Sequence, residues 1–183
     1  PVQSGSDAVL RRMLRTYTVD HYRRVVAACR ERVKGFALAT DLIVGFCGET
    51  DAELEETVRL MEEIRFQGAF VFRYSERKGT SAAQDYRDDV PEEVKRERNQ
   101  ILLKLQRRIS GEIHRERLGS VEEVLVEGTS KLDPGRLTGR NRGNQIVVFP
   151  GISREGLSGK LVPVKITDST PLVLVGERVG PGR

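Results

Sequence analysis

The amino-acid sequence predicts an α/β region followed by a small antiparallel β-barrel. Residues 1–118 alternate the patterns of strands and helices, as parallel β/α units do. Residues 119–183 instead hold short valine-rich runs separated by Gly, Pro, Asp and Ser, which is typical of a small barrel. Between two of the α/β elements, the stretch TDLIVGFCGET at 40–50 runs from a buried strand through two glycines directly into a helix. We therefore expect two domains, at 1–118 and 119–183.

The first helix follows Thr18, which we expect to be its N-cap. Apolar side chains then recur at helical spacing and predict one buried face. They are Tyr22, Val25, Val26, Cys29 and Val33. A buried strand follows in FALATDLIVGF, at 36–46.

The second helix begins after Thr50, which together with Glu53 has the spacing of a capping box. Its apolar stripe is predicted to be Leu54, Val58, Met61 and Ile64. GAFVFRYS at 68–75 reads as the next strand, and Pro91 suits the first position of a long helix. The stripe of that helix is predicted to be Val94, Ile101, Leu102, Leu105, Ile109 and Ile113.

Composition narrows the functional class only slightly. Charged residues make up 32% of the chain and the net charge is +4, which permits a nucleic-acid partner without requiring one. No run approaches the roughly 18 apolar residues of a membrane span, and we expect no membrane partner. The two cysteines, Cys29 and Cys47, suggest neither a disulfide framework nor a metal site, so a reducing cytoplasmic setting is expected. Because the chain begins at Pro1, we expect it to be part of a longer protein.

The segment Gly45–Glu49 is the first candidate binding site. A strand that passes through glycines into a helix places backbone N–H groups at the carboxyl edge of a parallel sheet, where a flat ligand can lie against the main chain. A tight strand-to-helix turn with no ligand explains the glycines equally well.

Five stretches of the chain together resemble a known family. They are PVQSGSDAVLRRMLRTYT at 1–18, TDLIVGFCGET at 40–50, FRYSERKGTSAA at 72–83, VPEEVKRER at 90–98, and VLVEGTSKLDPGRLTGRNRGNQIVVFPG at 124–151. Their order and spacing are similar to those of the radical S-adenosylmethionine (SAM) methylthiotransferases, in particular the MiaB-type enzymes that modify tRNA. The resemblance covers essentially the whole chain.

The resemblance implies both the fold and the chemistry. Residues 1–118 would be the C-terminal half of a radical-SAM β/α barrel, which is TIM-like but partial, and residues 119–183 would be a TRAM domain, an OB-like RNA-binding β-barrel. The family uses SAM and two [4Fe-4S] clusters to add a 2-methylthio group to a modified adenosine next to the anticodon. The cluster ligands would lie outside this chain, so it would hold no metal and have no activity alone. The implied partners are the tRNA anticodon stem-loop and a protein that donates sulfur or electrons.

Site residues follow from the same resemblance. Cofactor contacts are expected from Gln3, Ser4, Arg15, Asp41, Gly45, Phe46, Gly48 and Glu49. Among these, Arg15 would hold the methionyl carboxylate, and the main chain of 45–49 would lie against the adenine. Substrate contacts are expected from Tyr74, Ser75, Lys131, Arg136, Arg140, Arg142, Asn144 and Phe149. The basic residues would neutralise phosphates, while Asn144 and Phe149 would bond or stack on an unpaired base.

The sequence shows no arrangement of a general base and a nucleophile, so no catalytic side chain is assigned, and His21 and His114 are expected to be surface residues. Three positions depart from the family pattern: Leu14 replaces asparagine, Cys47 replaces proline, and Ser81 replaces a frequent proline.

Several alternatives stay open. The modified nucleoside could be threonylcarbamoyladenosine, or the substrate could be a ribosomal protein. The chain could also belong to a catalytically dead RNA-binding module, in which the basic residues act alone. The residues bracketed by Lys131 and Gln145 could equally be a solvated basic face.

Overall fold

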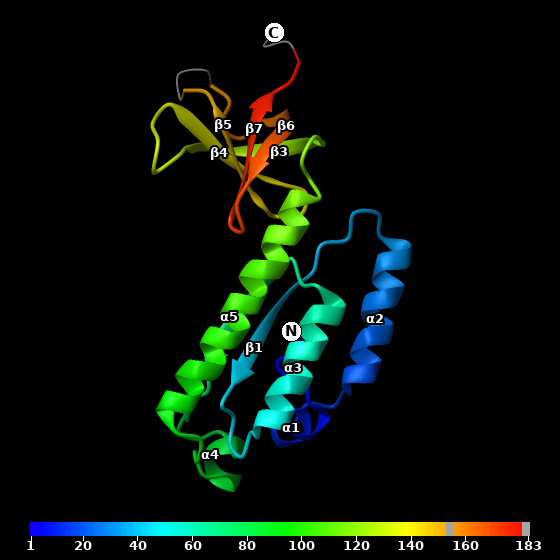
Figure 1. The fold of residues 1–183 in the computed structure, drawn as a ribbon, viewed down its shortest axis with the longest axis vertical. Coiled ribbons are helices and arrows are strands. Elements are labelled where there is room, and N and C mark those ends of the chain that lie inside the picture. Colours follow the sequence, from blue (N-terminus) through cyan, green and yellow to red (C-terminus); the bar gives the residue numbers. More distant parts are fainter. Residues whose placement is uncertain (153–155, 181–183) are drawn as a thin grey trace. The chain divides into compact units, whose positions relative to one another are not determined.

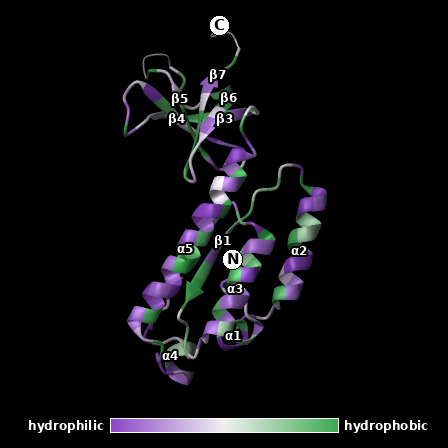
Figure 2. Cartoon of the chain, viewed as in Figure 1, coloured by the Kyte–Doolittle hydropathy of each residue, from purple (hydrophilic) through white to green (hydrophobic). Residues whose placement is uncertain are grey.

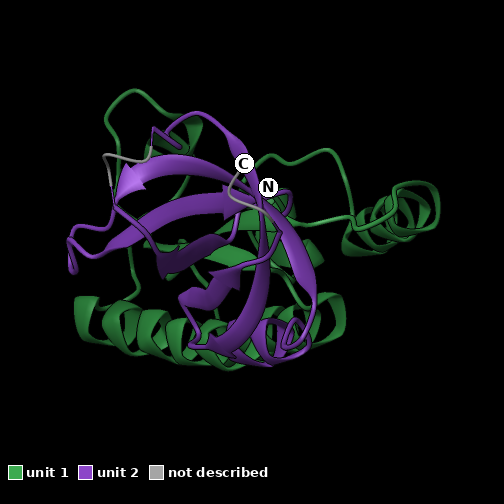
Figure 3. Cartoon of the chain, turned by 90° about the horizontal axis from the view of Figure 1, so that it is seen from above, with its two compact units in different colours: residues 1–109 green, residues 110–183 purple. Residues whose placement is uncertain are grey.

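A computed structural model of the chain describes residues 1–152 and 156–180 (Figure 1). The chain forms two compact units, residues 1–109 and 110–183, which Figure 3 distinguishes by colour. The composition of the sequence suggested a change at residue 119, close to the start of the first barrel strand at Val121. By packing, the second unit also includes the last turn of the long helix that precedes it.

The first unit contains two parallel β/α units. Its elements are α1 (Asp7–Arg12), α2 (Val19–Arg32), β1 (Ala39–Val44), α3 (Asp51–Ile64), β2 (Gly68–Arg73), α4 (Ser81–Asp85) and α5 (Glu92–Arg115). Strands β1 and β2 pair in parallel, and Gln3 forms a parallel bridge with Leu42 on the other edge of β1. The predicted α/β class is therefore confirmed.

Strand β1 separates the core of this unit from an open inner face. Leu42 and Val44 are almost fully buried, whereas Asp41 and Ile43, which point the other way, are only half-buried. The second half of β1 is coloured as hydrophobic, while the helices carry mixed faces (Figure 2). Phe70 and Phe72 of β2 pair with Asp41 and Ile43 and are 65% and 52% exposed, so the inner face is partly apolar.

The predicted helix starts are confirmed. The side chain of Thr18 accepts a hydrogen bond from the His21 N–H, and Thr50 and Glu53 form a complete capping box. Pro91 stands just before the first helical residue of α5, Glu92, where its fixed φ suits entry into a helix.

The predicted apolar stripes are only partly correct. Ile101 and Val25 are 42% and 46% exposed. In α5 the predicted Leu102, Leu105 and Ile109 are buried, and the same row also includes Lys95, Arg98 and Gln106. Three of these six side chains are polar. Hydrophobicity alone could not reveal this row, because its charged members are buried by their ion-pair partners.

The second unit is a closed five-stranded barrel. Its strands are β3 (Val121–Thr129), β4 (Arg136–Asn141), β5 (Ile146–Pro150), β6 (Leu161–Ser169) and β7 (Val173–Arg178), in the order β3-β4-β5-β7-β6. The predicted barrel is confirmed, and its pairs are antiparallel except β5 with β7, which is parallel. Gly139 faces inward, and a Cβ there would lie 2.2 Å from the Leu125 carbonyl oxygen, so the strands approach closely only because this residue has no side chain.

His114 is buried in this second unit, which corrects the expectation that it lies on the surface. It is 4% exposed, and its Nδ1 lies 2.6 Å from the Thr170 carbonyl oxygen in the loop between β6 and β7. Because a carbonyl only accepts hydrogen bonds, Nδ1 carries the proton in the neutral ring. Burial lowers the pKa of His114, and the nearby charge of Arg117 lowers it further, against the opposing effect of the Thr170 bond.

This lowered pKa predicts a pH-dependent stability of the second unit. The folded unit binds fewer protons at His114 than the unfolded chain does. The contribution of His114 to the free energy of unfolding is therefore complete above its ordinary pKa of 6.5 and is lost as the pH falls below that value. Unfolding followed from about pH 8 to about pH 5 should show this loss. A His114→Gln variant should lack that part of the dependence, whereas His21→Gln should keep it. An unchanged pH profile for His114→Gln would contradict the assignment.

Candidate functional site

The turn between β1 and α3 is built around two glycines with positive φ. Gly45 and Gly48 have φ angles of 69° and 68°, a region that residues with a Cβ rarely adopt. Between them Phe46 and Cys47 are buried. The main chain therefore reverses within a few residues and enters α3 with its capping box already formed.

Two carboxylates hold the N–H groups of this turn. The Glu49 carboxylate accepts a hydrogen bond from the Gly45 N–H at 2.6 Å and pairs with the Arg98 guanidinium at 3.0 Å. Asp89 accepts from the Gly48 N–H at 2.7 Å. Burial raises the pKa of Glu49 although Gly45 and Arg98 favour its charged form. Arg98 also donates to the Glu49 carbonyl oxygen at 2.9 Å and so ties helix α5 to the turn.

Arg12 of α1 holds the carbonyl groups of the same turn. Its Nε donates to the Cys47 carbonyl oxygen at 3.1 Å, and its terminal nitrogens bond both carboxylate oxygens of Glu53 at 3.0 and 2.9 Å. Burial alone would raise the pKa of Glu53, but the bonds from Arg12 and Thr50 outweigh it and hold the pKa below its ordinary value. The turn is thus fixed from both sides by charged groups.

Most of this turn faces the helices and not a ligand. A Cβ on Gly45 would lie 2.3 Å from Cγ of Lys95, whose ammonium group pairs with Asp88 at 2.6 Å. The carboxylate of Glu49 already forms an ion pair with the Arg98 guanidinium. Of the predicted cofactor contacts in 45–49, only Phe46 lines the neighbouring cavity. Gly45, Gly48 and Glu49 therefore shape the turn, and any cofactor contact from them would have to come from the main chain.

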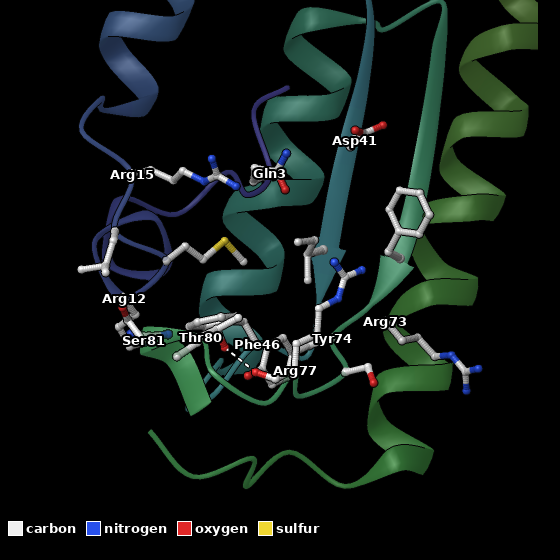
Figure 4. A pocket seen from close by; sticks show the side chains of 16 residues that line it. Gln3, Arg12, Arg15, Asp41, Phe46, Arg73, Tyr74, Arg77, Thr80 and Ser81 are labelled. Carbon is white, nitrogen blue, oxygen red and sulfur yellow. Dashed lines mark hydrogen bonds between the residues drawn. The ribbon is translucent and has the colours of Figure 1, made fainter. Parts of the chain in front are cut away.

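A cavity of about 590 Å³ opens beside this turn on the inner face of the sheet (Figure 4). It brings together six of the predicted site residues, Gln3, Arg15, Asp41, Phe46, Tyr74 and Ser75. The other lining residues were not anticipated, and they come mainly from the loop after α1 and the turn after β2. They are Arg12, Met13, Leu14, Ile43, Phe72, Arg73, Arg77, Thr80, Ser81 and Ala82.

Three polar side chains that line the cavity have no hydrogen-bond partner within the described part of the protein. Gln3 is held by its main chain, which donates to the Asp41 carbonyl and accepts from the Ile43 N–H, at a φ of 67°. The side chains of Gln3, Arg15 and Asp41 make no hydrogen bond or ion pair to the residues described here. In Figure 4 the guanidinium of Arg15 extends toward Gln3. One cation, one anion and one amide therefore remain available to a ligand.

Aromatic side chains form the floor of the cavity. The rings of Phe46 and Tyr74 meet edge to face with centroids 4.8 Å apart, and the Lys95 ammonium lies 5.3 Å from the Tyr74 centroid. Burial, followed by the neighbouring Cys47 thiol, raises the pKa of Tyr74 to about 12. Its hydroxyl therefore stays protonated at neutral pH and can donate a hydrogen bond.

Ser4 was predicted to contact the cofactor, and its position does not support that role. It is fully buried, its hydroxyl lies 3.4 Å from that of Thr57, and it accepts a hydrogen bond from the Ser6 N–H. These contacts attach the start of α1 to helix α3. A strand-end serine looks the same in sequence whether it faces a ligand or the neighbouring helix.

The predicted RNA-contacting residues of the second unit follow strand β4. Arg136 and Arg140 share its outward face and stand about 13 Å apart along the strand. Lys131 lies before the strand, while Arg142 and Asn144 lie in the hairpin after it. Asn141 closes that hairpin by accepting hydrogen bonds from the Gly143 and Gln145 N–H groups, and Asn144 has a φ of 62°.

The arginines of this surface already have acidic partners. Arg136 pairs with Asp133, Arg140 with Glu127 and Arg142 with Glu123, at 3.2, 3.2 and 2.8 Å. All these pairs are exposed, so each is weak and a phosphate can replace the carboxylate. Lys131 and Lys160 form no ion pair with any residue in the described part of the chain.

Phe149 was predicted to stack on a base, and its position excludes that role. It is fully buried among the core side chains of the barrel, including Val147, Val164 and Leu174. It is also the only aromatic residue from 110 to 183. Any RNA contact by this unit would therefore use charge and hydrogen bonds instead of aromatic stacking.

Neither cysteine has a position that fits an iron–sulfur cluster. Cys47 is buried against Val9 and Phe46, and Cys29 lies on helix α2. Within residues 1–152 and 156–180, no three His, Cys, Asp or Glu side chains lie close enough to hold a metal ion. In the same ranges no helix is long and apolar enough to cross a membrane.

Comparison with known proteins agrees with the division of the chain into two units. Residues 1–61 match the radical SAM superfamily and residues 115–179 match the TRAM domain. The chain is 50% identical over 177 residues to a protein of Chlorobium limicola, which covers 96% of this chain and 39% of that protein. It is 48% identical over 180 residues to a protein of Symbiobacterium thermophilum, or 98% of this chain and 37% of that protein. Both relatives are named tRNA-2-methylthio-N(6)-dimethylallyladenosine synthase.

The chain thus combines part of a radical SAM domain with a TRAM domain. Its similarity to both of these relatives extends over nearly the whole chain. The chain spans about two fifths of the length of the curated relatives it matches.

The contacts of Arg12 predict that it stabilises the turn through Glu53. Replacing Arg12 with Gln should raise the pKa of Glu53 and cost about 2 kcal/mol of stability at neutral pH, because charge-assisted bonds are lost. Because the pKa of Glu53 is lowered, this carboxylate stabilises the folded state above its ordinary pKa of 4.5, and that stabilisation is lost in acid. The stability of the variant should therefore depend less on acid pH. An NMR titration measures the pKa of Glu53, and chemical unfolding measures the free energy of unfolding. The neighbouring exposed Arg11→Gln is the matched control, and an unshifted Glu53 in Arg12→Gln would disprove the coupling.

The burial of Phe149 predicts a purely structural role. Phe149→Ala should destabilise the barrel by about 3–5 kcal/mol, because it removes a ring from the packed core. Arg142→Ala, at a side chain that is 85% exposed, should change stability by less than about 0.5 kcal/mol. Thermal unfolding of the two variants provides the comparison. If Phe149→Ala left the melting temperature unchanged but weakened RNA binding, the stacking role would be restored.

Proposed function

We propose that this chain is part of a tRNA methylthiotransferase that adds a 2-methylthio group to N6-isopentenyladenosine, also called N6-dimethylallyladenosine, next to the anticodon. Relatives at 45% to 50% identity carry that name, and the similarity extends over nearly the whole chain. The observation that carries the proposal is the cavity, where Gln3, Arg15 and Asp41 converge without partners beside an aromatic wall.

The cavity lining fits SAM. The cofactor has an amino acid end with opposite charges and a flat adenine. Arg15 would bind the carboxylate through charge-assisted hydrogen bonds, and Asp41 would accept hydrogen bonds from the ammonium or ribose groups. Gln3 would bond neutral polar atoms, and Phe46 offers an apolar surface to the adenine.

The bound cofactor, together with iron–sulfur clusters, supplies the radical chemistry, while these residues orient the reactants and exclude water. Cys29 and Cys47 do not fit as cluster ligands, so we assign no step of the reaction to a cluster in this chain. Tyr74 and Ser75 line the same cavity and would contact the target nucleoside.

The second unit would bind the tRNA anticodon stem-loop through its basic surface. Lys131 and Lys160 have no acidic partner among the described residues, whereas Arg136, Arg140 and Arg142 would exchange an exposed carboxylate for a phosphate. Because the proposed substrate is tRNA, we expect the enzyme to act in the cytoplasm and to use protein donors of sulfur or electrons.

Deleting the full-length gene tests the proposed function. Mass spectrometry of tRNA nucleosides should show that the 2-methylthio derivative disappears and that N6-dimethylallyladenosine accumulates. The wild-type gene should restore the modification, whereas Asp41→Asn or Arg15→Gln should lower it at least about tenfold, because each removes a charged cofactor contact. Arg24→Gln, a change in an exposed ion pair, is the control and should restore it fully.

Persistence of the 2-methylthio nucleoside in the deletion strain would refute the proposal. Loss of a threonylcarbamoyl derivative instead would identify the other tRNA substrate class. If all nucleosides were unchanged and a ribosomal protein lost its modification, the ribosomal alternative would hold.

A further inference from the structure

The turn after β2 presents an arginine to the cavity that cofactor binding does not require. Thr80 holds the Arg77 carbonyl oxygen with both its N–H, at 3.2 Å, and its hydroxyl, at 2.8 Å (Figure 4). Gly79 has a φ of 85°, which closes the turn, and Thr80 then caps α4 through the Ala83 N–H. The main chain of Arg77 is therefore fixed before any ligand binds.

The guanidinium of Arg77 has no partner in the described part of the chain. Of the four arginines that line the cavity, Arg12 is bound to Glu53 and Arg73 to Glu92. The side chains of Arg15 and Arg77 have neither a hydrogen bond nor an ion pair to another described residue. Glu76 precedes Arg77 in sequence and Lys78 follows it, and neither of these two residues lines the cavity.

The charges in the cavity favour a further anion. Two guanidiniums without partners, from Arg15 and Arg77, line it together with one carboxylate, from Asp41. SAM cannot balance them, because its ammonium and sulfonium groups outweigh its single carboxylate and it enters as a cation. If Arg15 takes that carboxylate, the exposed guanidinium of Arg77 remains available to a second anion.

The hydroxyl groups near Arg77 suit phosphate oxygens. Ser75 and Ser81 line the same cavity, and no described residue forms a hydrogen bond with either hydroxyl. Arginine together with serine hydroxyls is a common donor set for the phosphates of nucleic acids. The hydroxyl of Ser81 is therefore free to donate a hydrogen bond to a phosphate oxygen.

We propose that Arg77, assisted by Ser75 and Ser81, binds a phosphodiester group of the RNA strand that carries the target adenosine. This inference rests on the proposed function and adds a phosphate site within the first unit, separate from the basic surface of the barrel. It would hold the strand at the cavity mouth while the base reaches the cofactor.

The full-length protein and a synthetic anticodon stem-loop RNA carrying N6-dimethylallyladenosine provide the test. Arg77→Gln should weaken binding of this RNA about tenfold, because a charge-assisted contact is lost. The slope of log affinity against log salt should fall by about 0.7, the value for one phosphate contact in a single strand. Arg77→Lys should keep most of the slope, and SAM affinity should be unchanged in both variants. Arg87→Gln is the matched control, because Arg87 is exposed and does not line the cavity.

A second series places one neutral methylphosphonate at each position around the target adenosine. At one position the neutral group should weaken binding to the wild type and have no further effect on Arg77→Gln. If the methylphosphonate and Arg77→Gln weakened RNA binding independently at every position, the inference would be overturned. The same holds if Arg77→Gln bound the RNA as tightly as Arg87→Gln does. A loss of SAM affinity in Arg77→Gln would also overturn it, because Arg77 would then bind the cofactor carboxylate. A wild-type protein that binds SAM but not this RNA would refute the proposed function itself.

Discussion

The ion pair between Glu49 and Arg98 is the contact on which the geometry of the first unit depends. It joins the turn after β1 to helix α5, and the same carboxylate fixes the Gly45 N–H. Both side chains are almost completely buried, so losing either partner would leave an uncompensated charge at a cost of about 3–5 kcal/mol. Arg12 and Asp89 then fix the remaining polar groups of the turn. One wall of the cavity is therefore rigid because the charges behind it are paired.

The cavity and its supporting shell use charge in opposite ways. Behind the turn each charged group has a partner, as Lys95 has Asp88 and Arg12 has Glu53. On the inner face Arg15, Asp41 and Arg77 have none among the described residues. Paired charges maintain a shape, whereas unpaired charges at a concave surface favour a charged ligand. This contrast distinguishes the binding surface from the scaffold more clearly than the residue types do.

The second unit likewise separates its stabilising contacts from its charged surface. Its core is made of aliphatic side chains and Phe149, and its outward arginines lie in exposed pairs with acids. Exposed pairs contribute little to stability, so the arginines can change partner without disturbing the barrel. A surface of this kind suits contact with the sugar–phosphate backbone of a nucleic acid.

The sequence by itself determined the local elements and the resemblance to known proteins. The caps at Thr18 and Thr50, strand β1 and the closed barrel follow from short-range patterns, and the motifs that carry the resemblance are continuous in the chain. The tertiary structure decided which way side chains face. It placed Ser4 against α3, Phe149 in the barrel core and His114 against Thr170, and it brought Arg77 to the cavity beside Gln3. Orientation depends on partners distant in sequence, and the charged row of Lys95 and Arg98 is buried only because its acidic partners fold against it.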